Sequence, residues 1–167
     1  MNQLRSTLLV VLAGLAATGC AFLNPASLPA GASVGEATKT LGKPTGEYAL
    51  PSGGKRLEFA RGPYGKHTWM LDFDASGVLK TTTQVLTEPQ FNAVRAGMSR
   101  DELLFAIGRP SETSRLAFQH QTVWSYRYES PFCQWFQVGI DEGGKVADSG
   151  YYPDPLCEDN VNDRDSM

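Results

Sequence analysis

The chain has 167 residues, of which 15 are Lys or Arg and 18 are Asp or Glu, so its net charge at pH 7 is −3. A protein of this sign lacks the positive charge that would attract the phosphates of nucleic acid, and we expect no nucleic-acid partner. The length is sufficient for one domain of ordinary size or for two very small ones.

The N-terminus has the pattern of a secretion signal. A basic segment, 1–5, precedes an apolar run, 8–17, that is shorter than the roughly 20 residues of a membrane-spanning helix. The letters "LAATGC" at its end are similar to the bacterial lipobox, in which the cysteine is lipidated and becomes the first residue. We therefore predict a signal peptide over 1–19 and a lipid on Cys20, which would attach the protein to a membrane. The alternative is an unmodified thiol after an ordinary cleavage site.

The sorting rule for lipoproteins adds a location to this prediction. Position 21 is Ala and not Asp, and the resemblance to lipoproteins then implies an anchor in the outer membrane, facing the periplasm. Residues 20–29 are expected to form a short lipidated tether. Residues 154–167 form an acidic tail that is poor in apolar side chains and is expected to be disordered beyond Cys157.

With Cys20 assigned to lipid, two cysteines remain. Disulfides persist in exported proteins, and Cys133 and Cys157 allow one intramolecular pair. The alternatives are two free thiols or a bridge between molecules. We favour the Cys133–Cys157 bridge, which requires a Cα–Cα distance of about 4.4–6.8 Å.

An internal repeat organises the rest of the chain. The stretch "PAGASVGEATKTLGKP" at 29–44 matches "RAGMSRDELLFAIGRP" at 95–110 with an offset of 66 residues, and further matches follow with an offset of 67. Such agreement indicates a duplication. The units are expected over 30–84, a degenerate first copy, and over 86–153.

Each copy begins with a short helix. Ser33 with Glu36, and Ser99 with Glu102, have the spacing of capping boxes, which start a helix at the serine. A glycine followed two residues later by a proline then ends each helix. The second copy has an additional helical segment, "TEPQFNAVR", at 87–95.

Alternating apolar residues then predict strands in each copy. These segments are 56–60, 68–73 and 78–79 in the first copy, and 123–128, 135–140 and the region of Val146 in the second. The expected fold class is α+β, with two tandem units that each pack one or two helices on a three-stranded antiparallel meander. The pattern leaves open whether the two units share one continuous sheet.

The capped helix with its Gly-x-Pro end, the aromatic strand "VWSYRY" and the hairpin "VGIDEGGKV" resemble the SmpA/OmlA (BamE-like) domain of outer-membrane lipoproteins. The resemblance covers 86–150 well and 29–80 more loosely, and it implies two tandem copies. It also implies envelope proteins as partners, including components that assemble β-barrel proteins. The arrangement of two repeats is similar to that of the β-lactamase inhibitory proteins.

Candidate functional residues are aromatic side chains and not titratable ones. No converging set of acids, bases or nucleophiles is visible, so we expect no catalytic residue, cofactor or metal site. Trp135 lies on the non-core face of its strand, where it either packs between elements or contacts a partner. Further partner-binding candidates lie in or near loops: Tyr64, Phe132, Tyr151 and Tyr152.

These observations favour a non-catalytic binding or scaffold module of the bacterial envelope. The alternative is a protein inhibitor that covers the active site of an enzyme with a concave sheet face and a protruding loop. An enzyme is the least favoured class, because the sequence offers no site for it.

Overall fold

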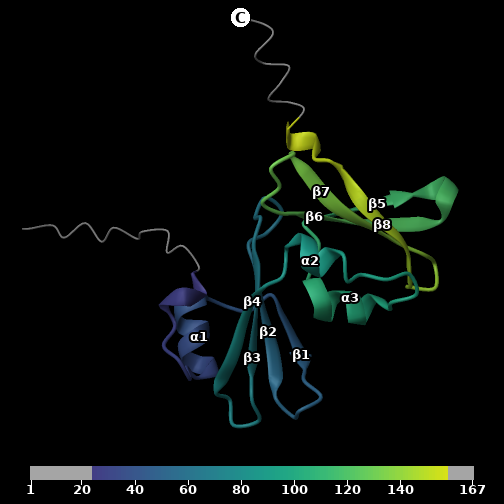
Figure 1. Cartoon of the computed structure of the whole chain (residues 1–167). Coiled ribbons are helices and arrows are strands. Elements are labelled where there is room, and N and C mark those ends of the chain that lie inside the picture. Colours follow the sequence, from purple (N-terminus) through teal and green to yellow (C-terminus); the bar gives the residue numbers. More distant parts are fainter. Residues whose placement is uncertain (1–23, 158–167) are drawn as a thin grey trace, which may run out of the picture.

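The computed structural model describes residues 24–157 and contains two four-stranded antiparallel sheets with short helices (Figure 1). The expected α+β class with two small tandem units is confirmed. The two sheets are separate, because the last strand of the first unit does not pair with the first strand of the second. The signal segment 1–19, Cys20 and the end of the tail lie outside the described residues.

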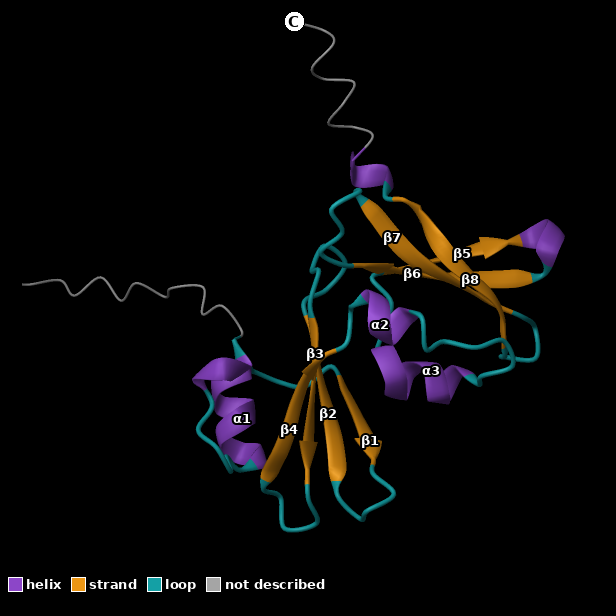
Figure 2. Cartoon of the chain, viewed as in Figure 1, coloured by secondary structure: helices purple, strands orange, loops and turns teal. Residues whose placement is uncertain are grey.

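The first unit consists of a 3-10 turn, a helix and four strands that pair in chain order (Figure 2). These elements are η1 (Pro25–Ser27), α1 (Val34–Leu41), β1 (Gly46–Ala49), β2 (Lys55–Ala60), β3 (Thr68–Phe73) and β4 (Leu79–Gln84).

The second unit repeats this order with one more helix. Its elements are α2 (Glu88–Phe91), α3 (Arg100–Ile107), β5 (Glu112–Leu116), η2 (Ala117–Gln119), β6 (Gln121–Arg127), β7 (Gln134–Ile140) and β8 (Val146–Pro153). Each sheet therefore has one strand more than the sequence predicted. The additional strands, β1 and β5, are short edge strands; every residue of β5 is exposed, so no apolar alternation marks it.

The repeat is visible in local geometry. Both α1 and α3 begin with complete capping boxes, in which Ser33 and Ser99 accept a hydrogen bond from the glutamate amide three residues on. Both helices end at a glycine with positive φ, 87° at Gly42 and 77° at Gly108, and with ψ near −167°. Only glycine readily adopts this backbone region, so the two helix ends require it.

The change of offset from 66 to 67 lies in a hairpin. The last pair before the turn is Ala49 with Lys55 in the first sheet, and Arg115 with Thr122 in the equivalent place of the second. The second hairpin thus contains the additional residue, and the strands after it remain in equivalent register. Both sheets also carry a bulge at matching positions, at Asp72/Phe73 and at Gly139/Ile140.

The helix predicted over 87–95 is much shorter than expected. Thr87 is the N-cap residue but makes no side-chain capping bond, and α2 ends at Phe91. The chain then continues in turns that place Val94 in the core. Tertiary packing of Phe91 and Val94 therefore decides where this helix ends.

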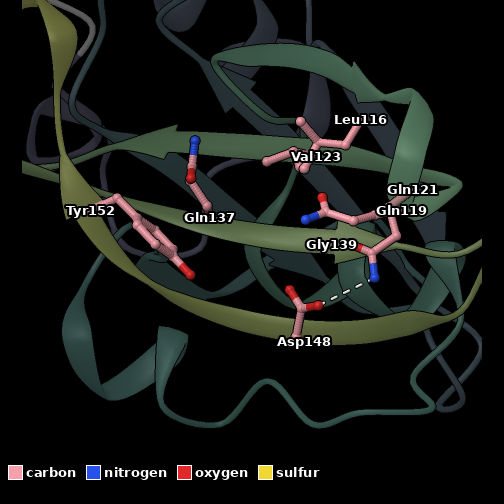
Figure 3. A pocket seen from close by; sticks show the side chains of 8 residues that line it. All are labelled: Leu116, Gln119, Gln121, Val123, Gln137, Gly139, Asp148 and Tyr152. Atoms are coloured by element: carbon pink, nitrogen blue, oxygen red, sulfur yellow. Dashed lines mark hydrogen bonds between the residues drawn. The ribbon is translucent and has the colours of Figure 1, made fainter.

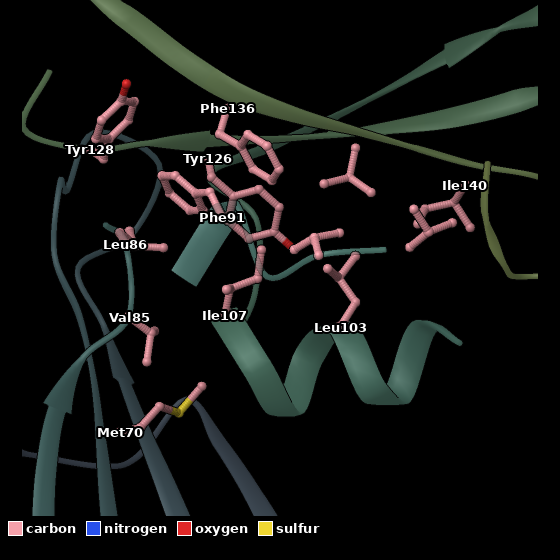
Figure 4. Packing of buried hydrophobic residues seen from close by; sticks show 13 residues of the cluster. Met70, Val85, Leu86, Phe91, Leu103, Ile107, Tyr126, Tyr128, Phe136 and Ile140 are labelled. Carbon is pink, nitrogen blue, oxygen red and sulfur yellow. The ribbon is translucent and has the colours of Figure 1, made fainter. Parts of the chain in front are cut away.

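The two sheets have different cores. In the first unit, α1 packs its buried Ala37 and Leu41 on one face of the sheet, against Leu57, Phe59, Leu71 and Phe73. In the second unit, α2 and α3 cover a face rich in aromatic side chains, on which Phe91 stacks on Phe136 with ring centroids 4.5 Å apart (Figure 4). The second core also includes Met70 of the first unit, Val85 from the link between the units and Leu86 at the start of the second unit. The two units therefore share buried apolar surface.

Helix α3 also contacts the face of the first sheet opposite to α1. The guanidinium of Arg56 donates to the carbonyl oxygen of Phe105 at 2.9 Å and lies 4.2 Å from the centroid of the Phe105 ring. Asp72, its partner across the strand pair, accepts from Arg56 at 2.6 and 2.8 Å, and these bonds lower the pKa of Asp72. Gly108 lies so close to this sheet that an added methyl group would come within 3.0 Å of Thr68.

A buried carboxyl group joins the helix end to the first sheet. Glu58 is fully buried and accepts hydrogen bonds from the hydroxyl of Tyr48 at 2.5 Å, the hydroxyl of Thr45 at 3.0 Å and the amide of Arg109 at 3.2 Å. Burial and the bond to Glu58 raise the pKa of Tyr48 well above its usual value. On the other side of the helix end, Tyr126 of β6 donates to the carbonyl oxygen of Gly108 at 3.1 Å.

We predict that Glu58→Ala lowers the free energy of unfolding by about 1–3 kcal/mol, because it removes a buried acceptor that three partly buried donors share. Urea unfolding followed by tryptophan fluorescence measures the loss. Glu47→Ala is the matched control, since Glu47 pairs with Lys55 at 2.6 Å but is more than half exposed. Such a surface pair contributes about 0–1 kcal/mol. Equal losses in the two variants would contradict the role of Glu58.

Candidate functional site

One face of the second sheet is covered by neither α2 nor α3, and it is hollowed. Figure 3 shows the hollow, which has a volume of about 380 Å³ and extends across β5, β6, β7 and β8. Its lining combines side-chain amides, one carboxylate, one phenol ring and a few aliphatic groups. The lining residues are Leu116, Gln119, Gln121, Val123, Gln137, Gly139, Asp148 and Tyr152.

A glycine forms the floor of the hollow. A methyl group at Gly139 would come within 2.7 Å of both Asp148 Oδ1 and Gln121 Oε1. Across this floor the amide of Gln121 donates to Asp148 at 3.2 Å, and the amide of Gln137 donates to the hydroxyl of Ser125 at 2.9 Å (Figure 3). No lysine, arginine or histidine is among the lining residues. The site is therefore polar and carries one negative charge.

The equivalent face of the first sheet explains why this hollow exists. Arg56 lies opposite Asp72 in the first sheet, and Val123 lies opposite Gly139 in the second, at positions related by the offset of 67. Glu58 has its equivalent in Ser125. Arg56 and Glu58, which contact the end of α3, and Asp72, which pairs with Arg56, are thus replaced by smaller side chains. The second sheet lacks the groups that hold a helix on this face, and the face is open there.

Trp135 lies on this non-core face, as the sequence predicted, but it is only 7% exposed. Arg127 covers it, with the guanidinium carbon 5.0 Å from the ring. Arg127 also donates to Asp154 at 2.9 Å and to the carbonyl oxygen of Pro63 at 2.8 Å. Packing, one of the two alternatives for Trp135, accounts for its position; a contact with a partner through its ring is largely blocked.

The other predicted aromatic residues separate into three environments. Tyr64 and Phe132 are 73% and 77% exposed. Tyr151 packs against the aromatic core and donates to Asn92 at 3.0 Å, so little of it is available to a partner. Tyr152, which is half exposed, forms the rim of the hollow.

Tyr64 and Phe132 belong to two loops that the structure connects. The loop 61–67 of the first unit and the loop 128–133 of the second are joined by the bond of Arg127 to Pro63 and by an ion pair of Lys66 with Glu129 at 3.6 Å. We call these two loops, with their exposed rings, the loop pair. The sequence separated these candidates by 68 residues, and only the fold brings their loops together.

The disulfide between Cys133 and Cys157 is confirmed, with a Cα–Cα distance of 6.1 Å. It fixes the first residues of the acidic tail, as expected for a bridge that ties this segment down. Asp154 is buried, pairs with Arg127 and donates its amide to the carbonyl oxygen of Cys133 at 2.9 Å. The ion pair of Asp154 with Arg127 was not predicted, because a carboxylate that pairs with a buried arginine has the same sequence signature as a solvated one.

Several residues of the hollow were not predicted. Gln121, Gln137 and Asp148 carry no motif, but Gln137 and Gly139 occupy the places of Met70 and Asp72 in the first copy, so comparison of the copies marks them as divergent. The sequence also gave no indication of Phe118, which is fully exposed in η2, between β5 and β6.

The described residues offer little reactive chemistry. Within residues 24–157, no group of three or more His, Cys, Asp or Glu could hold a metal ion. His120 contacts Glu142 at 3.1 Å, and both side chains are largely exposed. In the same range, none of the helices has the length and apolar character needed to cross a membrane.

Comparison with known proteins gives limited matches. No family model and no curated protein matches the chain. Over 48% of its length, the chain is similar to the osmotically inducible lipoprotein OsmE. The identity is 32%, the match covers 84% of that protein, and the TM-score is 0.36. An extracellular protein with a SCP domain from Bacillus anthracis str. Ames matches 74% of the chain and 44% of its own length, with 8% identity and a TM-score of 0.29.

We predict that the double variant Cys133→Ser, Cys157→Ser loses about 3 kcal/mol of unfolding free energy. The bridge joins residues 24 positions apart, and closing such a loop lowers the conformational entropy of the unfolded chain. Urea unfolding with and without reductant tests this. Reductant should lower the midpoint of the wild type and leave that of the double variant unchanged. An unchanged wild-type midpoint in reductant would refute the prediction.

Proposed function

We propose that the protein is a lipid-anchored outer-membrane lipoprotein, facing the periplasm, that acts as a non-catalytic binding module for another envelope protein. The observation that carries the binding role is the loop pair, on which Tyr64 and Phe132 are 73% and 77% exposed. Exposed rings on loops anchored to a rigid scaffold have the composition of a protein-binding surface.

The loop pair is held in a way that suits recognition. Arg127 connects the loop 61–67 to Trp135 and Asp154, and the disulfide ties the same region to Cys157. A surface that is ordered before it binds loses less conformational entropy on association. The two rings can then contribute their apolar area to binding.

The nature of the partner follows from the sequence resemblance. BamE-like domains, of which we propose that the chain contains two tandem copies, imply components that assemble β-barrel proteins as the first partners to test. Two units with a disulfide-bonded tail differ from a single such domain, so another envelope protein is an equal candidate. We propose no catalytic role and no cofactor, because the described surfaces present exposed rings and amides and not a converging set of acids and bases.

A second candidate function is inhibition of an enzyme by the open face of the second sheet. The observation that favours it is Phe118, which is fully exposed at the tip of the hairpin of β5 and β6, next to the hollow. A protruding aromatic residue beside a concave sheet face is the arrangement that an inhibitor of this kind requires.

The anchor is tested by labelling with radioactive palmitate and by membrane fractionation. We expect the wild type to incorporate label and to co-sediment with outer membranes, because acyl chains on Cys20 hold it there. Cys20→Ser should lose the label and the attachment, whereas Cys157→Ser should keep both. Label that persists in Cys20→Ser would contradict lipidation at this residue.

The binding surface is tested by affinity capture from solubilised envelopes. The double variant Tyr64→Ser, Phe132→Ser should recover at least tenfold less of a specific envelope protein than the wild type, because exposed aromatic anchors commonly dominate binding energy. Phe118→Ser is the control, since it removes an equally exposed ring elsewhere. Equal recovery by all three proteins would refute the proposal, and a loss confined to Phe118→Ser would favour the inhibitor.

A further inference from the structure

The hollow on the second sheet lies outside the loop pair, and a protein bound at the loop pair would leave it open. In the first unit the end of α3 covers the equivalent face. A methyl group added to Gly108 would lie 3.0–3.2 Å from side-chain atoms of Thr68, Glu58 and Met70. In the second unit the face is open and its lining differs. The repeat therefore provides an internal comparison of one concave face in a filled and an open form.

We propose that this hollow binds a small neutral saccharide. Its volume, about 380 Å³, lies within the range of roughly 300–1,000 Å³ typical of small-molecule sites. The ligand is identified by its chemistry, and the site does not include Tyr64 or Phe132 of the loop pair. This proposal goes beyond the proposed function and does not depend on it.

The amides of the lining match hydroxyl groups. The side chains of Gln121 and Gln137 each present a carbonyl oxygen that accepts and an NH₂ group that donates, and each uses one donor within the protein, toward Asp148 and Ser125. Their remaining donors and acceptors fit the paired donor and acceptor character of neighbouring sugar hydroxyls. A purely apolar ligand would bury these groups without partners, which is costly.

The charge of the lining disfavours an anionic ligand and does not require a cationic one. The only ionisable groups among the lining residues are the carboxylate of Asp148 and the phenol of Tyr152. A phosphate or carboxylate ligand would find no lysine or arginine there. Asp148 already accepts a bond from Gln121, so it can act as a further acceptor for a hydroxyl.

The shape of the hollow completes the argument. Gly139 has no side chain, so Asp148 and Gln121 meet above the floor, and a sugar would contact their polar atoms there. Tyr152, half exposed at the rim, offers an aromatic surface on which the C–H face of a sugar can lie (Figure 3). A helix of a second copy is a less suitable occupant, because Val123, Ser125 and Gly139 replace the residues that hold α3 on the first sheet.

The full-length lipidated protein, ¹⁵N-labelled in a detergent without a sugar headgroup, is titrated with cellobiose, maltose and N,N′-diacetylchitobiose. We expect saturable shifts of the Gly139 amide and of the side-chain amides of Gln121 and Gln137 with at least one of these disaccharides. Gln137→Leu and Gly139→Ala should each weaken that binding at least tenfold, because the first removes an amide and the second displaces the Asp148 and Gln121 side chains.

Gln134→Leu is the matched control, because Gln134 lies on the same strand but does not line the hollow, and it should bind as the wild type does. Unchanged binding in both Gln137→Leu and Gly139→Ala would overturn the proposal. Absence of shifts with all three disaccharides, or a response to cationic glucosamine alone, would also overturn it. So would concentration-dependent shifts of Gly139 without sugar, together with a dimer in sedimentation, since a second copy would then occupy the face.

Discussion

The end of α3 is the point on which both sheets depend. Gly108 has a backbone conformation that favours glycine and lies against the first sheet, where Glu58 accepts the next amide, that of Arg109. Tyr126 of the second sheet donates to the carbonyl oxygen of the same Gly108. A side chain at this position would be strained by the positive φ and would push Thr68, Glu58 and Met70 away by a few tenths of an ångström.

This contact makes two marginal units into one structure. Eight-residue helices and four-stranded sheets of this size bury little surface, so each unit by itself would be only marginally stable. Sharing Met70, Val85 and Leu86 with the aromatic core adds buried apolar area across the junction. The same junction distinguishes the copies, because the first sheet is covered on both faces by α1 and α3 and the second on one face only.

Because the two sheets are covered differently, the second sheet has surfaces that remain exposed and could bind a ligand or a partner. The uncovered face of the second sheet keeps the strand register of its counterpart but has amides and a glycine in place of its charged contacts. At the end of this sheet, Arg127 contacts the ring of Trp135, pairs with Asp154 and donates to the loop 61–67. These contacts hold the loops that carry Tyr64 and Phe132. The second copy of the duplicated unit therefore has an uncovered sheet face and, at the end of that sheet, the exposed loop pair.

The sequence by itself determined the elements whose signals are local. Ser33 and Ser99 start their helices because a capping box needs only four neighbouring residues, and Gly42 and Gly108 end them because the backbone there favours glycine. Period-two alternation gave the central strands, and two cysteines left one possible pair. Tertiary structure alone decided the edge strands β1 and β5, the early end of α2, the covering of Trp135 and the hollow at Gly139. Each depends on contacts between residues far apart in the chain, whose energies no local pattern records.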